Sequence, residues 1–64
     1  MKYIELKKLL KANNCKRVGE YKGHEKWYSP ITKQDFPVGR HDGQEVANGT
    51  LKAIEKQSGI KIRG

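Results

Sequence analysis

Two histidines are the residues of this chain best suited to acid–base chemistry. His24 follows a glycine, and His41 follows Arg40. Imidazole has an unperturbed pKa of about 6.5, so near neutral pH it can take a proton from one oxygen and give a proton to another. In RNA, a base that removes the proton of a 2′-hydroxyl lets that oxygen attack the adjacent phosphorus, and no metal is required. A single histidine in an arbitrary protein is more often structural or simply exposed, so the surroundings of His24 must decide.

The charge of the chain favours a polyanionic partner. Its 64 residues include 14 Lys and Arg against 7 Asp and Glu, a formal net charge of +7. Cations placed near phosphates release condensed counterions, so RNA, DNA and an acidic protein all remain possible partners. Four lysines near the amino terminus fit a solubilising role better than direct contact. They are Lys2, Lys7, Lys8 and Lys11.

Size and cysteine content exclude several kinds of site. A chain of this length can bury one small core, so we expect one domain over residues 1–64 and no cofactor. Cys15 is the only cysteine, which excludes an internal disulfide and, with two histidines at no ligand-like spacing, makes a metal site improbable. The sequence shows no secretory signal and no apolar run near the roughly 18 residues of a spanning helix. We therefore expect a soluble, cytoplasmic protein with no membrane contact.

The periodicity of apolar residues predicts two helices around three strands. The first helix runs from Tyr3 to about Asn13, and the second starts near Leu51 and ends before Gly59. The first helix has an apolar stripe at helical spacing, formed by Tyr3, Leu6, Leu9, Leu10 and Ala12. The predicted strands are 15–21, 24–29 and 35–40. This order predicts an α+β fold like that of double-stranded-RNA-binding domains, with one antiparallel sheet and both helices on one face.

Local signals predict the ends of these elements. Asn13–Asn14 can supply the left-handed residue that ends the first helix, and Asn48 or Thr50 can cap the second. After Gly59, a Schellman turn would pack Ile60 back near Ile54, and residues 61–64 are expected to be a frayed tail.

Alternation in the second and third strands separates a core face from an exposed face. It places His24, Lys26 and Tyr28 on one side of the second strand, with Glu25 and Trp27 on the other. Trp27 is expected in the core, since large aromatics of tiny domains usually are. In the third strand Phe36 and Val38 are expected to be buried, and Pro37 favours an edge position because it cannot donate to a ladder.

Three motifs, in this order and spanning nearly the whole chain, resemble the HicA family of toxin messenger-RNA interferases. They are Gly23-His24 followed by Trp27, the run from Phe36-Pro37 to Arg40-His41, and the segment from Gly49-Thr50-Leu51 to Gln57-Ser58-Gly59-Ile60. The chain departs from the family pattern in having Lys22-Gly23 where Gly-Ser is usual, and Gly39 where relatives often have a second proline. The resemblance implies the same α+β fold, an endoribonuclease with His24 as catalytic residue, and inhibition by a HicB-like antitoxin, with DNA met only through that antitoxin.

Several further residues are candidates for binding RNA. They are Lys22, Lys26, Tyr28, Arg40, His41, Lys52 and Lys56. Lys22 and Lys26 flank His24 and suit phosphates, and Arg40 suits a phosphate as well. His41 is either the general acid for the leaving 5′-oxygen or a solvated side chain beside Asp42. Lys52 and Lys56 form either a basic stripe that meets RNA backbone or a solvated helix side.

Two other functions remain open from the sequence. The first is a non-catalytic RNA-binding module, in which His24 only hydrogen-bonds the RNA. The second is a small DNA-binding or ribosome-associated basic protein, although no helix-turn-helix pattern is present.

Overall fold

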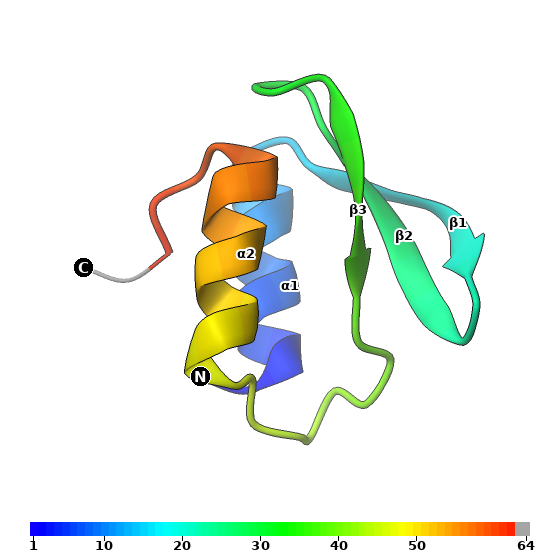
Figure 1. Cartoon of the computed structure of the whole chain (residues 1–64), viewed down its shortest axis with the longest axis vertical. Helices are drawn as coiled ribbons and strands as arrows, with labels where there is room; N and C mark the ends of the chain where they lie inside the picture. Colours follow the sequence, from blue (N-terminus) through cyan, green and yellow to red (C-terminus); the bar gives the residue numbers. More distant parts are fainter. Residues whose placement is uncertain (63–64) are drawn as a thin grey trace.

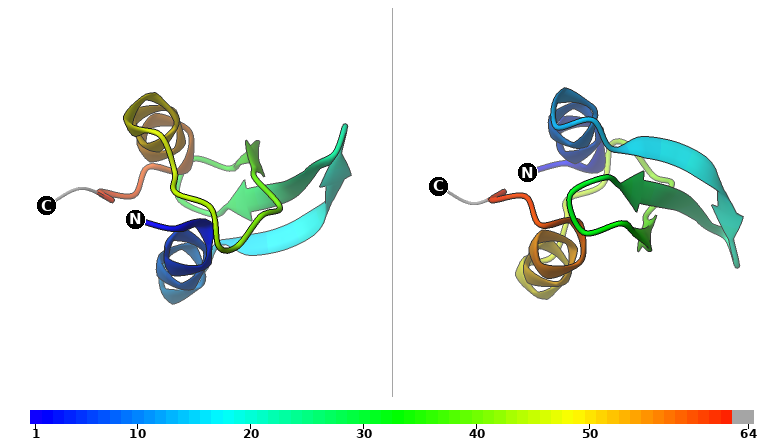
Figure 2. Two further views of the ribbon diagram at one scale, coloured as in Figure 1. Left: turned by 90° about the horizontal axis from the view of Figure 1, so that it is seen from below. Right: turned by 90° about the horizontal axis from the view of Figure 1, so that it is seen from above.

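The computed structural model describes residues 1–62, which form two helices packed on one face of a three-stranded sheet (Figures 1 and 2). The elements, in chain order, are α1 (Tyr3–Ala12), β1 (Lys16–Tyr21), β2 (His24–Ser29), β3 (Gln34–Val38) and α2 (Asn48–Ser58). The sheet is antiparallel, with β2 between β1 and β3. The α+β element order and the layering predicted from the sequence are therefore confirmed.

The core lies between the sheet and the two helices. Trp27 is 1% exposed and sits opposite Phe36 in the β2–β3 ladder, and both side chains meet Leu6 and Leu10 of α1 in one apolar cluster. The prediction that Trp27 belongs to the core is confirmed. Ala12, by contrast, is exposed. It comes two residues after Leu10, which turns it about 200° away around the helix, so its place in the predicted stripe was wrong.

The ends of the helices agree with the sequence at the carboxyl side and differ at the amino side. Asn14 has φ 68° and Gly59 has φ 74°, so left-handed residues follow both helices as predicted. The helix α2 starts at Asn48, three residues before Leu51, and its N-cap is Ala47 with no side-chain cap. The predicted Asn48 or Thr50 cap is wrong because the carbonyl of Ala47 already accepts the N–H of Leu51 at 3.0 Å.

The segment that follows α2 belongs to the core instead of fraying. Ile60 is buried with Ile54, as predicted, but its N–H donates to Ser58 Oγ and not into a Schellman turn. Ile62 is also buried, and its N–H donates to Glu55 Oε2 at 2.9 Å. The predicted frayed tail is therefore wrong for residues 61–62, and its last two positions, 63–64, lie outside the described residues. No helix in the part of the chain that the structure describes is long and apolar enough to span a membrane.

The strand β3 is an edge strand, as Pro37 predicted, but it ends at Val38 and not at Arg40. Gly39 lies against the ring of Tyr3, where a Cβ atom would stand only 2.7 Å from Tyr3 Cζ. From Gly39 the chain leaves the sheet for the start of α1, where the N–H of Ile4 donates to the carbonyl of Asp42. This bond satisfies one of the free N–H groups in the first turn of α1 and holds the loop of residues 39–47 in place.

Candidate functional site

A two-residue turn presents His24 at the start of β2. Lys22 and Gly23 both have positive φ angles, 46° and 86°, as in the type I′ turns that join antiparallel strands. Tyr21 and His24 are the last pair of the β1–β2 ladder and flank this turn. His24 is exposed, as expected for a residue beside a turn glycine.

The strand register separates the side chains of β2 between the two faces of the sheet. Glu25 and Trp27 face the helices, since Glu25 binds Lys7 of α1 and Trp27 lies in the core. His24, Lys26 and Tyr28 alternate with them and therefore share the opposite surface. We call this surface the outer face. From the ladder pairs it carries Lys16, Gly19, Tyr21, His24, Lys26, Tyr28, Asp35 and Pro37.

Arg40 and His41 lie at the end of the sheet where His24 is found. The strands β2 and β3 are antiparallel, so the start of β2 and the end of β3 meet, and their last ladder pair joins Glu25 and Val38. Arg40 and His41 follow directly in the loop of residues 39–47, and both are exposed. The structure thus brings two of the predicted RNA-binding residues to the end of the sheet that carries His24.

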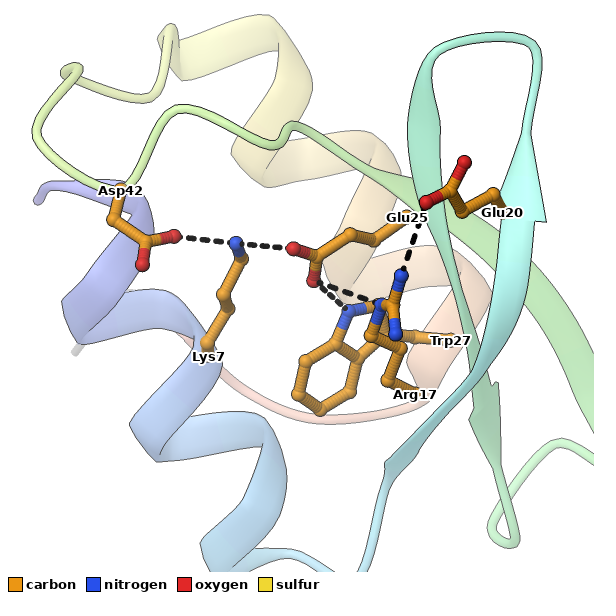
Figure 3. Close-up of polar contacts among 6 residues, drawn as sticks. All are labelled: Lys7, Arg17, Glu20, Glu25, Trp27 and Asp42. Carbon is orange, nitrogen blue, oxygen red and sulfur yellow. Dashed lines mark hydrogen bonds and ion pairs between the residues drawn. The ribbon is translucent and has the colours of Figure 1, made fainter.

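On the core side of the sheet, the buried Lys7 of α1 links the loop of residues 39–47 to β2 (Figure 3). Lys7 Nζ donates to Glu25 Oε2 at 2.9 Å and to Asp42 Oδ1 at 2.5 Å, and only 9% of its side chain is exposed. The interpretation of Lys7 as a solubilising lysine is therefore wrong. Its partners are 18 and 35 residues away, so no local pattern revealed them. The sequence did contain one indication of this contact. Glu25 was predicted on the core face of its strand, where a carboxylate needs a cationic partner.

Glu25 has several partners on the core side of the sheet. The indole Nε1 of Trp27 donates to Glu25 Oε1 at 3.0 Å, and Arg17 Nε lies 3.8 Å from the same oxygen (Figure 3). Burial opposes the charged form of Glu25, but the hydrogen bonds from Lys7 and Trp27 outweigh it and lower the pKa of the carboxyl. For Lys7, burial acts against the charge as well, and the bonds to Asp42 and Glu25 raise its pKa overall. The residue next to His24 is thus held in an ionic network.

Two residues of the outer face escaped the sequence reasoning. Asp35 Oδ2 lies 3.4 Å from Lys26 Nζ, so Lys26, which was predicted to contact a phosphate, already has an acidic neighbour. Tyr21 stands beside His24 in the ladder and is 53% exposed, but the sequence predicted only that it ends the strand 15–21. The β2–β3 and β1–β2 pairings would have revealed both, once the register was known.

The basic pair on α2 lies apart from His24. Lys52 and Lys56 are exposed on a helix that covers the opposite face of the sheet (Figure 2). The structure does not bring them together with the other predicted RNA-binding residues. Within residues 1–62, no group of three His, Cys, Asp or Glu side chains is placed to hold a metal ion.

These features define a small basic α+β protein with an exposed imidazole on a sheet face that also carries lysines. A comparison with known protein families identifies the family to which the protein belongs. Residues 4–60 match the HicA toxin family of bacterial toxin–antitoxin systems, and the chain therefore belongs to that family. No curated protein and no solved structure gives a significant match.

Proposed function

We propose that this toxin is an endoribonuclease that cleaves messenger RNA with His24 as the catalytic base. The observation that carries the proposal is the exposed position of His24 at the β1–β2 turn, in a chain that belongs to a toxin family. An imidazole that reaches solvent beside a turn can approach a 2′-hydroxyl of flexible RNA. The neighbouring cations then supply the attraction for phosphates.

The proposed reaction is an attack within the RNA itself. His24 takes the proton of a 2′-hydroxyl, and that oxygen bonds to the adjacent phosphorus while the bond to the 5′-oxygen breaks. Arg40, which lies at the same end of the sheet, offsets the charge of the phosphorane. The leaving 5′-oxygen takes up a proton, for which His41 is the candidate donor. The products are a 2′,3′-cyclic phosphate and a 5′-hydroxyl.

The chemistry of the products tests this mechanism. Purified protein is incubated with an RNA oligonucleotide in excess EDTA, and the ends of the fragments are identified by mass spectrometry. Cleavage in EDTA with cyclic phosphate or 3′-phosphate ends is expected, and a single 2′-deoxy substitution at the cut site should block it. Products with 3′-hydroxyl ends would contradict attack by the 2′-oxygen.

The proposed regulator is a HicB-like antitoxin that covers the outer face near His24. Membership of a toxin–antitoxin family supports the existence of such a partner. The net charge of +7 favours an acidic inhibitor, because complementary charge speeds encounter. Covering His24 would block the hydroxyl that has to be deprotonated, so inhibition and recognition would use one surface.

A further inference from the structure

A hollow of about 400 Å³ lies on the outer face, beside the candidate catalytic residue. It is lined by Tyr21, Lys26, Asp35, Phe36 and Pro37. Opposite Lys26 on β1 stands Gly19, and nothing lies within 4 Å of the position that a Cβ atom would take there. The strand next to Lys26 therefore carries no side chain on the outer face at this position.

Tyr21 forms the side of this hollow nearest to His24. The two residues are ladder partners, and such partners on one face have Cβ atoms about 4.5–5.5 Å apart. Tyr21 is 53% exposed and does not belong to the core cluster. Lys22 Nζ stands 5.9 Å from the centre of the ring, within the range of a cation–π contact. Exposed aromatics beside lysines are the arrangement on which bases of single-stranded nucleic acids stack.

The opposite side of the hollow is polar. Lys26 Nζ and Asp35 Oδ2 lie 3.4 Å apart, and both side chains are about two-fifths exposed. An ammonium group offers hydrogen-bond donors and a carboxylate offers acceptors, which is the combination needed to read the edge of a base. A phosphate would be repelled by Asp35, so this pair suits a base better than it suits the RNA backbone.

We propose that the hollow is a subsite for one nucleobase of single-stranded RNA, belonging to a nucleotide next to the phosphate at His24. This inference rests on the proposed cleavage of RNA at His24. The base stacks on Tyr21 above Pro37, and Lys26 with Asp35 contacts its edge. Lys16 lies on the outer face and Lys22 lies in the β1–β2 turn, where the phosphates flanking the bound base would pass. Their positive charge therefore fits single-stranded RNA as the occupant. The subsite would give the toxin a preference for the base at one position.

An abasic scan tests the subsite without relying on cleavage. A single-stranded RNA with one abasic position, moved along the sequence, is bound to protein carrying His24→Gln, alone or combined with Tyr21→Phe or Tyr21→Ala. Stacking on an aromatic is worth about 1–3 kcal/mol per base, so removing the critical base should weaken binding about 5- to 150-fold. The same loss is expected with Tyr21→Phe, which keeps the ring. With Tyr21→Ala the loss at that position should disappear.

A second set of variants tests the shape and the polar side of the hollow. Gly19→Thr adds a side chain on the outer face opposite Lys26 and should reduce the abasic effect by crowding a bound base, with circular dichroism as the check on folding. Asp35→Asn should change which base is preferred at the critical position. Ile4→Ala is the control, because it removes an exposed apolar side chain from α1, on the other side of the sheet.

The possible failures can be told apart. If the wild-type protein cleaves no RNA but the abasic effect depends on Tyr21, the base subsite stands and the proposed nuclease activity fails. If the wild-type protein cleaves RNA and the abasic profile is the same with Tyr21 and with Tyr21→Ala, the subsite is overturned. It is also overturned if Tyr21→Ala leaves RNA binding unchanged and weakens only neutralisation by the antitoxin, because the hollow would then be a protein contact.

Discussion

His24 and Glu25 are neighbours in the chain but have opposite surroundings. His24 is exposed on the outer face, whereas the side chain of Glu25 is held by Lys7 and Trp27 on the core side. Strand alternation alone accounts for the position of these two side chains on opposite faces of the sheet. The strand β2 can therefore present the imidazole of His24 to solvent while the side chain of the next residue, Glu25, is anchored on the core side.

The first prediction at this scale concerns His24. His24→Gln should abolish RNA cleavage and growth arrest and leave the thermal stability unchanged, because the exposed imidazole contributes chemistry and not packing. Loss of a general base typically costs a factor of about 10² to 10⁴ in rate. Single-turnover cleavage of an RNA oligonucleotide and growth after induction measure both effects. A folded His24→Gln protein with full toxicity would instead favour a non-catalytic RNA-binding module.

The second prediction concerns Lys7 and its carboxylate partners. Lys7→Met should destabilise the fold at pH 7 by about 1.5 to 3 kcal/mol, the usual worth of hydrogen bonds to charged groups. In a domain of this size that corresponds to a fall in Tm of roughly 6–24 °C, since each kcal/mol shifts Tm by about 4–8 °C. Lys8→Met is the control, because Lys8 is an exposed lysine on the same helix.

The effect of Lys7→Met should also depend on pH. The pKa of Glu25 is lowered below its ordinary value of 4.5 in the folded protein. Its contribution to stability is therefore complete above pH 4.5 and is lost as the pH falls through the lowered pKa. The raised pKa of Lys7 matters only above pH 10.5, where its contribution is lost as the pH rises. The gap in Tm between wild type and variant should thus narrow below pH 4.5, and a gap that stays constant down to pH 2 would show that Glu25 is not the partner.

At the scale of elements, the β1–β2 turn combines a strained residue with a charge near His24. Lys22 has φ 46°, a left-handed conformation that Asn and Gly adopt more easily. Such residues cost of order 1–3 kcal/mol and are found preferentially at functional sites. Lys22 thus places a positive charge beside His24 at some cost to the stability of the hairpin.

A pair of substitutions separates strain from charge at Lys22. Lys22→Asn should raise Tm because Asn suits the turn, whereas Lys22→Gln should not, since Gln has no such preference. Both remove the charge, so both should lower the slope of log K against log salt for single-stranded RNA by about 0.7. Thermal melts and a salt titration of RNA binding measure the two effects. Equal Tm values for the two variants would show that the turn is unstrained.

The elements with strong local signals were the ones that the sequence predicted well. The strand alternation from His24 to Ser29 and the left-handed residues after both helices agree with the structure. Some errors were local, namely the place of Ala12 in the apolar stripe and the Asn48 or Thr50 cap of α2. The others concern long-range contacts. Gly39 meets Tyr3 just after β3 ends at Val38, and Ile62 is buried in the core. Neither contact leaves a periodic pattern in the sequence.

The candidate site shows the same difference between residues predicted from local patterns and residues brought in by long-range contacts. His24, Lys26 and Tyr28 could be placed on one face because they alternate within one strand. Tyr21 and Asp35 reach that face only through pairing between strands, and Lys7 reaches Asp42 only through the packing of α1 against the loop of residues 39–47. A single sequence carries little information about such pairings until the register is known.

For the whole molecule, the distribution of charge leads to a prediction about the antitoxin. Lys22 and Lys26 lie at the turn and on the outer face, whereas Lys52 and Lys56 lie on α2 across the sheet. Charge reversal of Lys22 and Lys26 together should slow association with the antitoxin strongly at low salt. The effect should fade at 1 M salt, where the Debye length is about 3 Å, compared with about 30 Å at 0.01 M. Stopped-flow association rates over this range of salt measure it.

The matched control is charge reversal of Lys52 and Lys56, which changes the net charge by the same amount on the other side of the sheet. If the antitoxin docks over His24, the control should slow association much less, because the field that guides the final approach is local. Protection of His24 from diethyl pyrocarbonate in the complex, measured in a His41→Gln background, provides an independent check. Equal slowing by both pairs, together with an unprotected His24, would show that net charge attracts the antitoxin and that it inhibits the toxin from a different surface.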